Sequence, residues 1–236
     1  MNAIRRAVFC LCGVLLLSGC AGTPKNPDDP WEGFNRANFA FNEGLDRHLL
    51  KPVAQGYDAV TPTPVRAGVG NFFGNLGDLW IGTNNLLQGK PGQAASDIGR
   101  FVINTTVGVF GLIDVATPMG LDKHNEDFGQ TLAVWGVGDG PYVVLPVFGP
   151  RTLRDAGALG ADLHFDLIND VFYPVRVRNS AKALRITDQR ASFLPAEKVL
   201  EQAALDKYNY LRSAYQQRRR SLIYDGKPPR EEVPED

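Results

Sequence analysis

Apolar residues at helical spacing mark the chain that follows the first thirty residues. They recur every three or four positions between Trp31 and Leu50, which predicts an amphipathic helix that Pro52 ends. Its apolar positions are Trp31, Phe34, Ala37, Phe41, Leu45 and Leu49. A neighbouring stripe carries Asn35, Asn38, Asn42 and Asp46. The stripe either faces water or, because asparagine is a poor helix former that solvated faces rarely select, forms a wall that contacts both apolar and polar material.

Two further helical stretches follow. Val65–Leu87 combines large apolar residues with glycines at positions 68, 70, 74, 77 and 82. Each glycine lowers helix propensity by roughly 1 kcal/mol relative to alanine, but small residues also allow two helices to approach closely. The stretch is therefore either one closely packed helix or a broken helix in a globular core. Gln93–Phe110 is the next helix, and the apolar run continues to Leu121, although Asn104, Asp114 and Pro118 argue against a plain spanning helix.

Glycines and prolines interrupt a short apolar run between Gly136 and Asp155. The glycines allow φ values that other residues avoid, and the prolines fix φ and remove donors, so no regular helix can cross the segment. We expect a rigid, irregular apolar segment, followed by a helix that begins at Thr152 with Asp155 at the capping position. The residues that form its signature are Gly140, Pro141, Tyr142, Pro146, Gly149, Pro150, Arg154 and Asp155.

Three helices are expected in the remaining chain. One follows Pro150 and ends at Tyr173-Pro174, a short one covers Asn179–Arg185, and a longer one covers Ala196–Tyr224. The longer one ends in three arginines that suit the negative end of the helix dipole. The charged, proline-rich stretch 225–236 has almost no apolar residues to bury and is expected to be disordered. The fold class is therefore mainly α, with a single domain over residues 31–224.

The first nineteen residues have the pattern of a signal peptide. Arg5 and Arg6 precede an apolar run, Ala7–Leu17, that is too short to span a membrane. The run ends in Leu-Ser-Gly before Cys20, which resembles the lipobox of bacterial lipoproteins, where the cysteine becomes the acylated N-terminus. Several acyl chains would anchor the protein permanently, since each buried CH₂ contributes about 0.8 kcal/mol. Residues 20–30 would then be a lipidated linker. By analogy with the sorting of bacterial lipoproteins, Ala21 after the cysteine favours the outer membrane.

Composition narrows the classes of function. The other two cysteines lie within the signal peptide, so the mature chain would have no disulfide and no cysteine-ligated metal. Without Arg5 and Arg6 the net charge is −3, which gives no basic field for nucleic acid.

Motifs of enzymes are also missing. The glycine-rich segment from Gly136 lacks the helix start that a phosphate loop needs, and no Gly-x-Ser-x-Gly elbow is present. His48, His124 and His164 are scattered, without the spacing of metal ligands. We therefore predict a protein that is not an enzyme and has no cofactor and no metal, although a hydrolase triad assembled in space remains a rival.

Seven segments, in order, resemble the MlaA/VacJ family of outer-membrane lipoproteins. They are Asp29–Arg36, Asn71–Leu76, Asn84–Lys90, Arg100–Thr105, Gly111–Ala116, Phe128–Leu132 and the Gly-Pro-Tyr to Arg-Asp pattern of Gly140–Asp155. The resemblance implies a ring-like helical bundle in the inner leaflet of the outer membrane, with an amphipathic channel through its middle. It also implies removal of mislocalised phospholipids from the outer leaflet and their transfer to the periplasmic carrier MlaC, with a trimeric porin as a common partner.

The resemblance also suggests site residues. Asn35, Asn38, Phe41 and Asn42 are the candidates for the channel wall, since amides can solvate a lipid head group without the grip of a cation. The loop Gly111–Phe128 is the candidate gate, with Asp114, Phe128 and Gly129 as its marked residues. Asp114 is isolated among apolar residues, where an aspartate more often caps a turn than serves a function. The alternative to a lipid channel is a structural, porin-associated lipoprotein without a channel of its own.

Overall fold

The computed structural model describes residue 26 and residues 29–197 and 206–230. The signal peptide and Cys20 lie outside the described residues. In chain order the elements are α2 (Glu32–Leu45), a π-helical turn (Asp46–Leu50), α3 (Lys51–Val60), α4 (Thr63–Leu87), α5 (Pro91–Thr106), a 3₁₀ turn (Thr117–Met119), α6 (Phe128–Val134), β1 (Tyr142–Leu145), β2 (Gly149–Thr152), α7 (Leu153–His164), α8 (Ile168–Val171), α9 (Val175–Ser192) and α11 (Lys207–Ile223). The prediction of a mainly helical fold is confirmed.

The first helix does not end at Pro52, as the sequence predicted. The π-helical turn Asp46–Leu50 joins α2 directly to α3, in which Pro52 occupies the second position. Proline is tolerated in the first turn of a helix, and π-turns interrupt the regular hydrogen-bond ladder without ending the helix. The helical path therefore continues to Val60, where Thr61 has extended backbone.

Helix α4 is one continuous helix despite its five glycines, which settles the alternative left open by the sequence. It packs along α5, and Gly82 lies in this contact. A Cβ at this position would lie 2.7 Å from Cγ1 of Ile98. Gly82 thus permits the close approach of the two helices, as the small residues of Val65–Leu87 suggested.

The glycine- and proline-rich segment is more regular than predicted. Tyr142–Leu145 and Gly149–Thr152 form a two-stranded antiparallel hairpin in which Tyr142 pairs with Thr152 and Leu145 with Gly149. Gly140 before β1 and Gly149 at the start of β2 adopt positive φ, and Pro146 lies in the turn. Pro150 lies within β2, where a two-stranded sheet has only edge strands that tolerate a missing donor, so the strands can still pair. The helix start is confirmed, since the Thr152 hydroxyl accepts a hydrogen bond from the Asp155 amide.

Helix boundaries in the last third differ from the predicted ones. The helix after Pro150 ends at His164, and the short α8 follows it. The predicted short helix Asn179–Arg185 is the middle of α9, which is eighteen residues long. Helix α11 begins at Lys207, where the Asp206 side chain accepts from the Asn209 amide. The first residue of the stretch that was expected to be disordered, Asp225, forms an ion pair with Lys90 at 2.7 Å.

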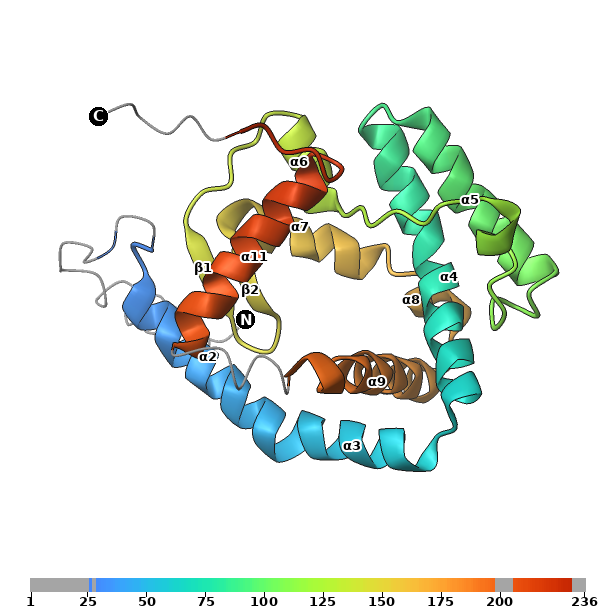
Figure 1. The fold of residues 1–236 in the computed structure, drawn as a ribbon, viewed down its shortest axis with the longest axis horizontal. Coiled ribbons are helices and arrows are strands. Elements are labelled where there is room, and N and C mark those ends of the chain that lie inside the picture. The colour runs from blue at the N-terminus through green and yellow to red at the C-terminus, as the bar shows by residue number, and fades with distance from the viewer. Residues whose placement is uncertain (1–25, 27–28, 198–205, 231–236) are drawn as a thin grey trace, which may run out of the picture.

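Contacts between elements run in a closed circuit, from α2 through α3, α9, α4, α6, α11 and the hairpin back to α2. Figure 1 shows these elements around an open middle of the ribbon. The buried apolar residues form small separate clusters, one around Phe73, Leu76, Ile168 and Ala181 and another around Tyr142, Val144 and Tyr208.

Exposure is inverted relative to that of an ordinary globular domain. The described chain exposes more large apolar side chains than it buries, and its buried residues include many Asn, Asp and Arg side chains. Extended exposed apolar surface marks contact with a membrane or another protein. Among the described residues no helix is long and apolar enough to cross a bilayer.

Candidate functional site

Asn35 fastens the hairpin to helix α2. Its Nδ2 donates to the Tyr142 carbonyl at 3.0 Å and to Asp29 Oδ1 at 2.7 Å, and its Oδ1 accepts from the Val144 amide at 2.8 Å. Asn35 is completely buried. The prediction that Asn35 lines a channel wall therefore does not describe this structure, because every polar atom of its side chain is used inside the protein.

Asn42 makes the equivalent contact two turns further along α2. Its Nδ2 donates to the Leu145 carbonyl at 2.9 Å, and its Oδ1 accepts from the Val147 amide at 2.7 Å. Seven helical residues span about 10.5 Å, close to the roughly 10 Å of three strand residues. The two amides thus satisfy backbone groups of β1 and of the turn that follows it, which would otherwise be unpaired.

The other two predicted wall residues lie elsewhere on α2. Asn38 is partly exposed, and its Nδ2 donates to the Phe34 carbonyl one turn earlier. The Phe41 side chain is 55% exposed. Of the four residues, Asn35 and Asn42 hydrogen-bond to the hairpin, whereas Asn38 bonds within α2 and the Phe41 side chain is exposed.

A cavity of about 510 Å³ opens beside Asn42, between α2, the hairpin, the end of α9 and the start of α11. Its apolar lining includes Phe39, Tyr142, Val144, Phe193 and Leu211. Burial, and to a lesser degree the charge of Asp29, raises the pKa of the Tyr142 hydroxyl to about 12, so this wall is uncharged at neutral pH.

Charged residues surround the same cavity. Arg190 donates to Asp46 at 2.6 and 2.8 Å and to Glu197 at 2.6 Å, and Lys207 donates to Glu43 at 2.9 Å. The carboxylates and cations of this rim are paired with one another, so the cavity combines apolar walls with a polar, ion-paired border. Such a surface can accept hydrocarbon beside a zwitterionic or charged group.

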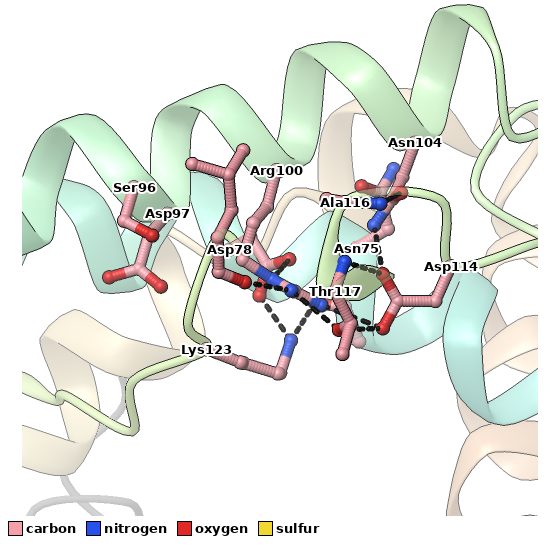
Figure 2. A network of polar contacts seen from close by, with 12 residues as sticks. Asn75, Asp78, Ser96, Asp97, Arg100, Asn104, Asp114, Ala116, Thr117 and Lys123 are labelled. Atoms are coloured by element: carbon pink, nitrogen blue, oxygen red, sulfur yellow. Dashed lines mark hydrogen bonds and ion pairs between the residues drawn. The ribbon is translucent and has the colours of Figure 1, made fainter. Parts of the chain in front are cut away.

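The predicted gate loop is tied to α5 through Asp114, as Figure 2 shows. Asp114 accepts from Arg100 Nη2 at 2.9 Å, from the Thr117 hydroxyl at 2.6 Å and from Asn104 Nδ2 at 3.1 Å. Burial opposes ionisation of Asp114, but these hydrogen bonds outweigh it and hold the pKa of the carboxyl well below its ordinary value. Asn104 Oδ1 also accepts from the amides of Val115 and Ala116 at 2.8 and 2.9 Å. Asp114 thus caps the turn, as aspartates in such positions commonly do.

Phe128 and Gly129 belong to a different network from Asp114. The Phe128 amide donates to Asp162 Oδ1 at 3.0 Å. A Cβ at Gly129 would lie 2.5 Å from Arg219 Nη2 and 2.5 Å from Asp155 Oδ1. Gly129 therefore lets helix α6 pack against buried charges, and the structure does not bring the three gate candidates together.

The residues of the predicted signature pack the hairpin against α7. Gly140 has φ +64°, and a Cβ there would lie 3.0 Å from the Cβ of Leu153. The Pro141 carbonyl accepts from the Leu153 amide at 2.9 Å. Pro146 lies in the turn between the strands, and Pro150 pairs with Val144.

Arg154 and Asp155 are buried, and Asp155 contacts Tyr215 and Arg219 of α11, which the sequence did not single out as a site. Arg154 pairs with Asp139 at 2.5 Å and with Asp155 at 3.1 Å. Arg219 donates to Asp127 at 2.6 Å and to Asp155 at 2.8 Å. The arginine cluster of α11 was interpreted as a match to the helix dipole. Only the alternation of buried and exposed faces of α11 distinguishes Arg219 from its neighbours.

His124 is paired with Asp97 of helix α5. Its Nδ1 lies 3.0 Å from Asp97 Oδ2, and its amide donates to Asp97 Oδ1. Among the described residues no group of three histidine, cysteine or acidic side chains could hold a metal ion.

Known proteins are similar to this chain in sequence and in fold. A family model described as MlaA lipoprotein matches residues 27–222. The chain is 37% identical to the intermembrane phospholipid transport system lipoprotein MlaA of Escherichia coli strain K12, over 94% of this chain and 90% of that one, and equally similar to its counterpart from Shigella flexneri. The Haemophilus influenzae protein of the same name is 31% identical over 96% of this chain and 94% of its own length.

A solved structure agrees with these relatives. It is described as the "Structural basis for maintenance of bacterial outer membrane lipid asymmetry" and has a TM-score of 0.71 and 35% identity to this chain. The match covers 84% of this chain and 99% of that one. The shared sequence, the shared helical fold and the extent of the match give one conclusion: this chain belongs to the MlaA lipoprotein family.

Proposed function

We propose that this protein is an outer-membrane lipoprotein that removes mislocalised phospholipids from the outer leaflet and passes them to a periplasmic carrier. The names of its relatives as intermembrane phospholipid transport lipoproteins support the class of substrate. The related solved structure, described as a basis for maintaining outer-membrane lipid asymmetry, supports a role in that asymmetry.

The cavity beside Asn42 is the observation that carries the proposal. A phospholipid that moves through protein must keep its chains on apolar surface and its head group near polar atoms, because an unpaired charge in hydrocarbon is strongly unfavourable. The cavity offers both, since the aromatic and aliphatic wall around Phe39 and Leu211 lies next to the paired charges of Arg190 and Asp46. We place the channel here. Of the four predicted wall residues, only Asn42 lines this cavity.

The exposed apolar surface supports residence in the inner leaflet, and acylation of Cys20 would anchor the protein on the periplasmic side. A carrier of the MlaC type and a trimeric porin are the partners that we propose. The rival is a structural lipoprotein that only accompanies a porin, and a lipid hydrolase is a second rival.

A bulky substitution in the cavity tests the proposal. Leu211 lines the cavity, whereas Gln217 is exposed on the same helix and does not. In a strain that lacks the protein, outer-leaflet phospholipid should rise and detergent resistance should fall. We expect the Gln217→Trp variant to restore both and the Leu211→Trp variant to restore neither, at equal protein levels.

Three results would contradict this account. A deletion strain with normal outer-leaflet phospholipid would exclude the function. Full restoration by Leu211→Trp would favour the structural role, since a scaffold needs no open cavity. Release of fatty acid or lysolipid by the purified protein would favour a hydrolase.

A further inference from the structure

A second cavity, of about 340 Å³, lies between α4, α9 and the turn that follows α5. Figure 1 shows α9 meeting α4 on this side of the fold. All eight lining residues are apolar, Phe72, Phe172 and Leu184 among them, and no polar atom contributes to the surface. None of them lines the cavity beside Asn42, so the two cavities are separate.

The chemistry of this lining restricts what can occupy it. A peptide backbone, a sugar or a lipid head group would bring polar atoms that find no partner there, which disfavours binding. An ordered water molecule likewise needs two or more polar partners. A hydrocarbon chain has no polar atoms and can contact the surrounding phenylalanine rings through dispersion.

The backbone beside the cavity is in an unusual conformation. Val109 and Phe110 have φ values of 53° and 57°, in the left-handed region that branched and bulky residues rarely adopt. The turn is held by a hydrogen bond from the Gly111 amide to the Asn104 carbonyl at 2.8 Å and by one from Asn71 Nδ2 to the Leu112 carbonyl at 3.2 Å. Such conformations persist where the surrounding structure fixes them, and they cluster at functional sites.

This turn places the ring of Phe110 at the cavity. Phe110 lines the cavity and its side chain is nevertheless 74% exposed, so the ring lies at the border of the cavity and is not packed inside it. Leu112, two residues later, lines the cavity as well. The strained turn therefore supplies part of the wall.

We propose that this second cavity binds one hydrocarbon chain of a membrane amphiphile, with the Phe110 ring lying along the chain. The site is distinct from the proposed transport cavity, and binding here does not require that the protein move lipid. The chain is held by contacts with the phenylalanines and with Leu184 from α9.

Photocrosslinking in vesicles tests the proposal. The full-length protein is placed in vesicles of phosphatidylethanolamine and phosphatidylglycerol that contain a trace of phospholipid with a diazirine at the end of one acyl chain. After irradiation, crosslinked residues are identified by mass spectrometry. We expect crosslinks to concentrate on the segment Val69–Phe73 and on Phe172, above the yield on other exposed apolar residues.

Two tryptophan variants of α9 provide the control. Leu184 lines the cavity and is 39% exposed, whereas Ile186 is 47% exposed and does not line it. The Leu184→Trp variant should lower the yield on Val69–Phe73 several-fold, and Ile186→Trp should leave it unchanged. Ala181→Leu is a second filling variant if Leu184→Trp has an altered circular dichroism spectrum.

The proposal would be overturned if the crosslinking yield on the cavity residues were no higher than that on the rest of the exposed apolar surface. Equal yields in the wild type and in both filling variants would also overturn it. If the protein shows the cavity crosslinks but its deletion leaves lipid asymmetry normal, the transport function alone would be refuted. Lipid transport without cavity crosslinks would refute the chain site alone.

Discussion

Replacement of Asn35 by leucine should destabilise the protein strongly. Leucine has a similar size, but it removes the bonds to the Tyr142 carbonyl, the Val144 amide and Asp29. Each of the two backbone groups would then be buried without a partner, at about 1–3 kcal/mol per group. Asp29 keeps its contacts with Tyr208 and Arg212, so its share of the loss is smaller.

The expected loss in the free energy of unfolding is therefore about 2–6 kcal/mol. At about 2–4 °C per kcal/mol for a chain of this length, the melting temperature should fall by roughly 4–24 °C. Thermal unfolding in a fixed detergent, followed by circular dichroism, measures it.

Asn38 provides the matched control, because it lies on the same helix and its Nδ2 donates to the Phe34 carbonyl of that helix. Asn38→Leu should change stability by no more than about 0.5 kcal/mol. A loss below about 1 kcal/mol for Asn35→Leu would refute the view that this amide holds the hairpin, since even one unpaired buried group should cost that much.

Three further predictions follow from single residues. The depressed pKa of Asp114 means that its stabilisation is complete above the ordinary pKa of 3.8 and is lost as pH falls below it; Asp114→Asn should remove this part of the acid dependence, and unchanged acid unfolding curves would contradict the argument. Gly129→Ala should destabilise by about 1–3 kcal/mol because its Cβ would collide with Arg219 and Asp155, whereas Gly157→Ala, with nothing within 4 Å, should not; equal melting temperatures would be inconsistent with this packing. Cys20→Ala should release the protein from membranes in fractionation experiments, and full membrane retention with normal function would count against the lipid anchor.

Sequence reasoning predicted the local features whose cause is local. The apolar spacing after Trp31 and the capping pair of Thr152 and Asp155 depend on residues a few positions apart, and both predictions agree with the structure. The extension of α9 was missed, because exposed arginines and few buried residues leave almost no periodic signal. Pro52 was misread, since only the π-helical turn before it shows that the helix continues.

The roles of the polar residues depend on partners distant in sequence. The amides of α2 were expected to face one common wall, yet Asn35 and Asn42 bond to a hairpin more than one hundred residues away. The pairing of Arg219 with Asp127 and Asp155 likewise joins α11 to α6 and α7. A single sequence shows which residues are polar and uncharged, but it carries no information about which distant backbone groups need them.

The central claim is that a phospholipid occupies the space between α2, the hairpin, α9 and α11. An experimental structure of the full-length protein in a lipid bilayer tests it most directly. We predict lipid density in the cavity beside Asn42, with the chains along Phe39 and Leu211 and the head group near Arg190. A middle filled by packed side chains, with no lipid and no opening to the bilayer, would contradict the claim.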